Sequence, residues 1–212
     1  MVMLGGQTIG VTFMSAHPDQ VGYGFSLTPG SLGLLAALAT VLSTAGAIGF
    51  PFAARRIGMR GVLSVGAFLG AASNLMLLPF HSQLWHVAAS LSLSGLAAGL
   101  MLGALPAVVA ENSPADQTGI ATGLYNSLKT IGGSAAGALF GMVLGSSAIA
   151  GSNSSSLSGY LTVWGIGGFA FIACLLALSQ LRSQPLTQVA ESAGASLNGS
   201  SMPTTAKEEI HP

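Results

Sequence analysis

Charged side chains are scarce in this sequence. Six Lys and Arg residues and six Asp and Glu residues occur among 212 positions, so only 6% of the chain is charged. About a quarter of the residues of a soluble domain are charged, because water must solvate its surface. The formal net charge is zero, so the chain has no basic face for phosphates, which excludes nucleic-acid binding. The single cysteine, Cys174, cannot form an internal disulfide.

Three long stretches carry no charge at all. They run between Gln20 and Ala54, between Gly61 and Ala110, and between Thr130 and Leu181. An α-helix needs about 20 apolar residues to cross the hydrocarbon core of a bilayer. The first stretch therefore fits one crossing after a long loop, and each of the others fits two crossings and a turn. The sequence predicts an all-α membrane protein whose outer surface faces lipid.

Six apolar segments predict a six-helix transmembrane bundle over residues 1–182. The first segment is short, and we expect its helix to be truncated at the beginning. The stretch 183–212 is polar and aperiodic, which predicts a disordered cytoplasmic tail. In chain order, the segments cover residues 2–16, 31–53, 62–80, 84–109, 118–145 and 158–181.

The basic residues alternate with these segments. Arg55, Arg56 and Arg60 lie between the second and third segments, Arg182 follows the sixth, and Lys129 lies near the start of the fifth. The loops on the other side contain no Lys or Arg. Cytoplasmic loops of membrane proteins carry the excess of Lys and Arg. The pattern therefore predicts a multi-pass plasma-membrane protein with both termini in the cytoplasm.

Two segments carry glycine at every fourth position. Small residues let helices approach closely in lipid, where association depends on van der Waals packing. We therefore expect close helix crossings at these rows. The glycines are Gly95, Gly99 and Gly103 in the fourth segment, and Gly133, Gly137, Gly141 and Gly145 in the fifth.

The arginine-rich stretch "AARRIGMRG" has a recognisable pattern. It resembles the signature cytoplasmic loop of the major facilitator superfamily, G-x-x-x-D-R-x-G-R-K, with Arg56, Gly58 and Arg60 at matching positions. Arg55 stands where the family has Asp, and such departures are common in the C-terminal copy of this loop. In the family, this loop is thought to lock the cytoplasmic gate through charge pairs. The resemblance therefore implies a gate loop that contains Arg55, Arg56, Gly58 and Arg60, while a positive cluster that only sets topology is the other interpretation.

A second stretch, "GIATGLYNSLKTIGGSAAGALFG", extends the resemblance. It is similar to the penultimate helix of the fourteen-helix drug:proton antiporter (multidrug efflux) branch, with Asn126, Gly133 and Gly137 on the family pattern and Lys129 replacing an Arg. The resemblance covers nearly all of residues 1–182. It implies the C-terminal half of a fold in which two six-helix bundles bind substrate between them near the membrane midplane.

The resemblance also implies a function. The chain would be the C-terminal half of a secondary active transporter for proton-coupled multidrug efflux, inactive without an N-terminal half. Gln7, Asn126 and Lys129 would line the substrate path, although Lys129 also fits a lysine that reaches the headgroups and helps to set topology. No predicted segment contains Asp or Glu, so the proton-coupling carboxylates would belong to the missing half. Glu111 and Asp116 are candidate partners for Arg56 on the cytoplasmic side.

Enzymatic patterns are missing. The four histidines lack metal-ligand spacing, and no nucleophile elbow or phosphate-binding loop occurs, so we expect no enzyme activity, no metal site and no cofactor. The expected partners are membrane lipid, a separate N-terminal transporter half or a second copy of the chain, and a small amphipathic substrate. The alternative is a non-transporting membrane scaffold that binds another helix bundle, because the glycine rows would serve it equally well.

Overall fold

The computed structural model describes residues 2–114, 116–149 and 155–180, with the backbone alone for residues 2–8 and for Gln20. The helices, except for Ser179 and Gln180, belong to one compact unit, Met1–Leu178. A second unit, Ser179–Pro212, lies almost entirely outside the described residues, as do Arg182 and the predicted tail at 183–212.

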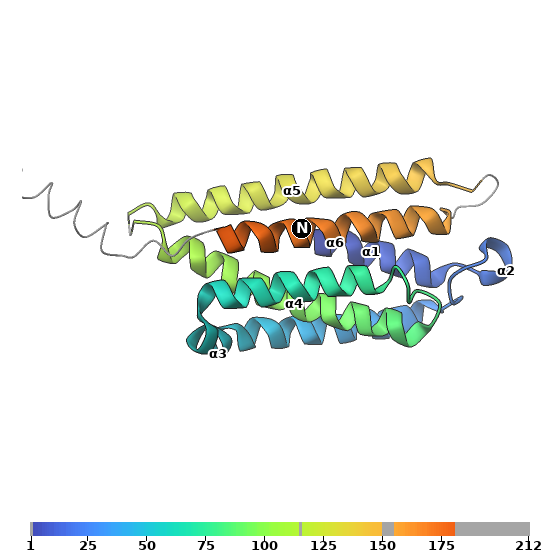
Figure 1. The fold of residues 1–212 in the computed structure, drawn as a ribbon, viewed down its shortest axis with the longest axis horizontal. Helices are drawn as coiled ribbons and strands as arrows, with labels where there is room; N and C mark the ends of the chain where they lie inside the picture. The colour runs from blue at the N-terminus through green and yellow to red at the C-terminus, as the bar shows by residue number, and fades with distance from the viewer. Residues whose placement is uncertain (1, 115, 150–154, 181–212) are drawn as a thin grey trace, which may run out of the picture. The chain divides into compact units, whose positions relative to one another are not determined.

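Helices and the turns between them make up the described part of the chain (Figure 1). Four helices there, α3 to α6, are long and apolar enough to cross a membrane, which agrees with the expected membrane helical bundle. With 14 residues, α1 is shorter than a full crossing. In chain order the helices are α1 (Val2–Ser15), α2 (Pro18–Val21), α3 (Pro29–Met76), α4 (Leu84–Glu111), α5 (Thr118–Ser146) and α6 (Leu157–Gln180).

The start of α3 follows from its local sequence. Thr28 is the N-cap in an extended conformation, and its side-chain oxygen accepts a hydrogen bond from the backbone N–H of Ser31 at 3.4 Å. Pro29 takes the first helical position, where its missing N–H has no partner to lose. Pro51 lies inside the helix, as proline often does in transmembrane helices, where neighbouring groups satisfy the freed carbonyl.

The arginine-rich stretch is not the multi-residue loop that the sequence predicted. Only Gly58 departs from helical geometry within α3, with φ 74° and ψ 165°. The Ala, Arg, Ile and Met residues around it favour a helix, and only glycine adopts this positive φ without strain. The break reverses the chain, so the second stretch of α3 (59–76) returns beside the first (29–57) (Figure 1).

Helix α4 packs closely against the first stretch of α3. A β-carbon at Gly95 or Gly99 would overlap a carbonyl oxygen of α3, and one at Gly103 would lie 2.5 Å from an aromatic ring. The backbones can therefore meet only because these positions lack a side chain. The facing residues of α3 are Ala39, Ser43 and Phe50, in that order.

A buried hydrogen bond and tight packing join the second stretch of α3 to its neighbours. The Ser90 hydroxyl of α4 donates to the carbonyl of Ser73 at 2.7 Å. Gly70 faces α6, where a β-carbon would lie 2.8 Å from the ring of Phe171. The second stretch of α3 is thus packed against both α4 and α6.

An aromatic cluster holds α1 to the rest of the bundle at the end opposite the arginines. The ring of Phe13 stacks on that of Tyr23 with centroids 5.2 Å apart, and it meets the rings of Tyr160 and Trp164 of α6 edge-on at 5.4 and 5.1 Å. The Tyr23 hydroxyl donates a hydrogen bond to the carbonyl of Ser155. The sequence alone does not reveal this cluster, because its members come from three separate segments.

Large apolar side chains cover much of the outer surface. Water would oppose such exposure over so many positions, whereas the acyl chains of a bilayer solvate it. Examples on α3 and α6 are Leu34 (73% exposed), Ile48 (66%), Phe52 (68%), Phe68 (62%) and Phe169 (68%).

Candidate functional site

Helix α5 is the long helix that contributes least to the core. Phe140 is its only buried residue, and Ala136 and Val143 pack beside it against the core cluster, which defines the face toward the bundle. A second face carries large exposed side chains suited to lipid. These are Ile120 (75% exposed), Leu124 (60%), Leu128 (61%), Ile131 (66%) and Met142 (72%).

A third face of α5 carries small and polar residues and is open. With 3.6 residues per turn, these positions line up between the core face and the apolar face. A β-carbon at each of its glycines would meet nothing within 4 Å, unlike the glycines of α4. We call this the small-residue face of α5; its exposed members are Gly119, Gly123, Asn126, Thr130, Gly137 and Gly141.

The predicted glycine row of the fifth segment follows this face. Gly133 is half-buried at its edge, and Gly145 is exposed with no atom near the position of a β-carbon. Among the described residues, no helix occupies the row. Its expected close crossing therefore stays a prediction about an element that the described part of the chain does not supply.

The three residues predicted to line the substrate path, Gln7, Asn126 and Lys129, differ in their surroundings. Asn126 is exposed on the small-residue face, and its backbone carbonyl accepts a hydrogen bond from the Thr130 hydroxyl at 2.9 Å. Lys129 is half-buried, with its Nζ 5.6 Å from the centre of the Tyr125 ring. The side chain of Gln7 on α1 lies outside the described residues.

Lys129 is not at the end of its helix. Eleven residues of α5 precede it, and at 1.5 Å per residue they span about 16 Å. The contact with the Tyr125 ring gives the ammonium group an attractive partner in a low-dielectric environment. A cation held part-way along a membrane helix is costly, and such residues usually face a polar pathway.

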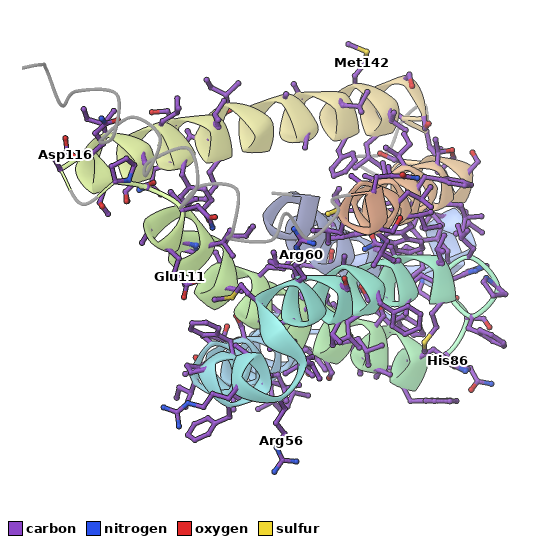
Figure 2. All side chains as sticks on the ribbon, turned by 60° about the vertical axis from the view of Figure 1, so that its left-hand side comes forward. Arg56, Arg60, His86, Glu111, Asp116 and Met142 are labelled. Atoms are coloured by element: carbon purple, nitrogen blue, oxygen red, sulfur yellow. The ribbon has the colours of Figure 1, made fainter. Side chains whose placement is uncertain are left out.

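The residues of the predicted gate loop surround the break in α3. Arg55, Arg56 and Arg60 are all exposed, and a β-carbon at Gly58 would meet nothing within 4 Å. Glycine is thus required there by the backbone conformation and not by lack of space. Figure 2 shows Arg56 and Arg60 pointing in opposite directions from the break. The end of the bundle that carries these residues is called the arginine end below.

The candidate charge pair of the arginine end is not formed in this structure. Arg56 points away from Glu111, the last residue of α4, and from Asp116, which precedes α5 (Figure 2). Within the described residues, no ion pair joins Arg56 to either carboxylate. The structure brings the three groups to the same end of the bundle without bringing them into contact.

A lateral cavity could not be predicted from the sequence, where the single cysteine, Cys174, indicated only that no internal disulfide forms. Cys174 is exposed on α6 and lines a cavity of about 200 Å³ together with residues of α3 and α4. The spacing of small and apolar residues along α6 was the sequence signal available for this cavity. This spacing could not be interpreted without knowing which helices pack on either side of α6.

The comparisons with known proteins gave one match. A family model described as Major Facilitator Superfamily matches residues 1–206, nearly the whole chain. No curated protein and no solved structure matches.

Proposed function

Because the chain belongs to the Major Facilitator Superfamily, a family of membrane transporters, we propose that it acts as the C-terminal half of a two-part transporter. The open small-residue face of α5 is the observation that supports this proposal. It carries Asn126, adjoins Lys129 and has no occupant among the described residues.

The contrast between α4 and α5 supports a partner helix at the open row of α5. On α4, the glycine row is filled by the backbone of α3, as close packing in lipid requires. On α5, a similar row of glycines is open. Acyl chains would contact the neighbouring face of large apolar side chains far better than they would contact this row. A helix from another bundle, either an N-terminal half or a second copy of this chain, would pack into that row.

The substrate path would run along this same face. Asn126 offers an amide on the exposed side of α5, and Lys129 offers a positive charge about 16 Å from the helix start. The described spans contain no carboxylate between Thr118 and Gln180, so a proton-coupled cycle would need acidic groups from the partner half. We infer multidrug efflux of small amphipathic substrates, with the arginine end and both termini on the cytoplasmic side of the plasma membrane.

Reconstitution tests the need for a partner. The chain is placed in proteoliposomes alone, and together with an N-terminal half of the superfamily encoded in the same genome, and dye uptake is followed under a proton gradient. Uptake only in the paired sample is the expected result. Uptake by the chain alone would contradict the two-part proposal and indicate a homodimer.

Glycine substitutions test the interface itself. Gly137→Leu and Gly141→Leu fill the small-residue face and should prevent co-purification with the partner half. Gly165→Leu on α6 is a matched control, because a β-carbon at Gly165 also meets nothing within 4 Å but lies outside the row. Equal loss of pairing in all three variants would contradict the proposed interface.

A membrane scaffold is the second candidate, because the open face of α5 would hold a non-transporting partner equally well. Stable co-purification with an unrelated membrane protein, together with no dye uptake in the paired sample, would favour the scaffold over the transporter.

A further inference from the structure

The lateral cavity shares no lining residue with the small-residue face, because none of its lining residues belongs to α5. It is lined by apolar side chains from three helices: Leu63 of α3, Met101 and Leu105 of α4, and Ala170, Phe171, Cys174 and Leu178 of α6. None of these residues belongs to the proposed substrate path or to the predicted gate loop. The cavity is therefore a separate feature, which we call the α6 groove.

The α6 groove has the depth of one leaflet of a bilayer. Its α6 residues run from Ala170 to Leu178, a rise of about 12 Å at 1.5 Å per residue. One leaflet of the hydrocarbon core is about 15 Å thick, half of the full thickness of about 30 Å. Leu178 lies near the end of α6, and Leu63 lies one turn beyond the start of the second stretch of α3. The groove thus extends from the arginine end toward the middle of the membrane.

The chemistry of the groove suits a hydrocarbon chain better than a drug-like substrate. Drug-sized sites occupy about 300–1,000 Å³ and contain a few polar groups that fix orientation. The groove has a volume of about 200 Å³, and its only side-chain heteroatoms are the sulfurs of Met101 and Cys174. An apolar occupant with no hydrogen bonds to make, such as an acyl chain, fills such a space without leaving a polar group unsatisfied.

A positive charge lies about one helical turn from a residue that lines the groove. Arg60 precedes Leu63 by three residues, so the two side chains lie on the same side of the helix. Arg60 is exposed, and Figure 2 shows it pointing in the direction opposite to Arg56. A guanidinium group at the headgroup level binds a phosphate through charge-assisted hydrogen bonds.

From these observations we propose that the α6 groove is a binding site for an anionic phospholipid. One acyl chain fills the groove between α3, α4 and α6, and the phosphate contacts Arg60 at the arginine end. This proposal depends on membrane insertion but not on transport. It gives Arg60 a role distinct from that of Arg56, although the sequence placed both in one gate loop.

Photo-crosslinking of the full chain in nanodiscs tests the site. The nanodiscs contain a minor fraction of either phosphatidylglycerol or phosphatidylcholine that carries a diazirine in the middle of one acyl chain. Crosslinked peptides are identified by mass spectrometry. We expect the peptide that contains residues 170–178 to be labelled about fivefold more by the anionic lipid, the effect of one basic side chain near an anionic group.

Two arginine variants separate a specific contact from general attraction. Arg60→Gln should reduce labelling by phosphatidylglycerol to the level of phosphatidylcholine, whereas Arg56→Gln, the matched control, should leave it unchanged. Ala170→Leu, which fills the groove, should abolish labelling of this peptide by both lipids. A retained helical spectrum and a retained elution volume establish that each variant is folded.

Three outcomes would overturn the proposal. Equal labelling by both lipids would exclude a headgroup contact, and equal loss in Arg56→Gln and Arg60→Gln would reduce it to a general charge effect. Weak labelling by both lipids that rises when residues 183–212 are removed would mean that the C-terminal segment of the chain itself fills the groove.

Discussion

Gly99 of α4 lies directly against the backbone of Ser43 of α3, so that a β-carbon at position 99 would overlap the Ser43 carbonyl oxygen. The same chemical feature, a glycine in a row of glycines, is open to its surroundings at Gly141 of α5. Position 99 therefore has no room for a side chain, whereas position 141 has room for one, although both glycines lie in rows with the same spacing.

Gly99→Ala should destabilise the chain by about 1–3 kcal/mol, because the added methyl group must push two helix backbones apart. Gly141→Ala is the matched control and should leave stability unchanged or slightly raised, because alanine favours a helix. The measurement is unfolding in mixed detergent micelles, followed by circular dichroism. Equal stability of the two variants would mean that α3 and α4 do not cross as closely as described.

Gly58→Ala should also destabilise the chain, but for a conformational reason. Gly58 has φ 74° and ψ 165°, a region that other residues occupy at a cost of about 1–3 kcal/mol. Gly49→Ala in the same helix is the control, since both positions have open space for a β-carbon, and Gly49 has no positive φ. The control should be neutral or stabilising, so a loss of stability in both variants would contradict the backbone explanation.

The sequence predicted the long helices well, because their signal is local. The fourth segment was expected at 84–109, and α4 covers Leu84–Glu111, with its ends set by the polar residues that flank an uncharged run. The resemblance to the major facilitator superfamily was confirmed by the match over residues 1–206, whereas the drug-antiporter branch and the C-terminal half stay predictions. Composition and spacing along one helix suffice to predict a membrane helix, because lipid favours apolar side chains over about 20 consecutive residues.

Features that depend on a second element could not be predicted in the same way. The spacing of the glycines on α4 and α5 is the same, and only the position of α3 decides which row is filled. The stretch around Gly58 was expected to be a loop because of its clustered arginines and its resemblance to the family's signature loop. Its residues are also helix formers, and the backbone conformation of the single residue Gly58 was enough to turn the chain. The α6 groove exists only where three helices meet.

Lys129 has two interpretations that a transport measurement separates. If it lines the substrate path, Lys129→Met should reduce transport by the paired transporter by about tenfold or more, the effect of losing one charged hydrogen-bonding group. Lys129→Arg keeps the charge and should retain most of the activity. If Lys129 only sets topology, Lys129→Met should transport normally whenever it is inserted correctly, which cysteine accessibility near the arginine end can establish.

Phe13 and Phe52 test whether the aromatic cluster stabilises the bundle. Phe13 is 1% exposed and contacts four other aromatic rings, so Phe13→Ala should lower the free energy of unfolding by about 3–5 kcal/mol. Phe52 is 68% exposed, and because its ring would mainly contact lipid, Phe52→Ala should change stability by only about 0.5 kcal/mol. Thermal unfolding in detergent, followed by circular dichroism, compares the two. Similar losses in both variants would mean that the cluster does not hold α1 to α6, and that α1 stays in place through contacts other than those of Phe13.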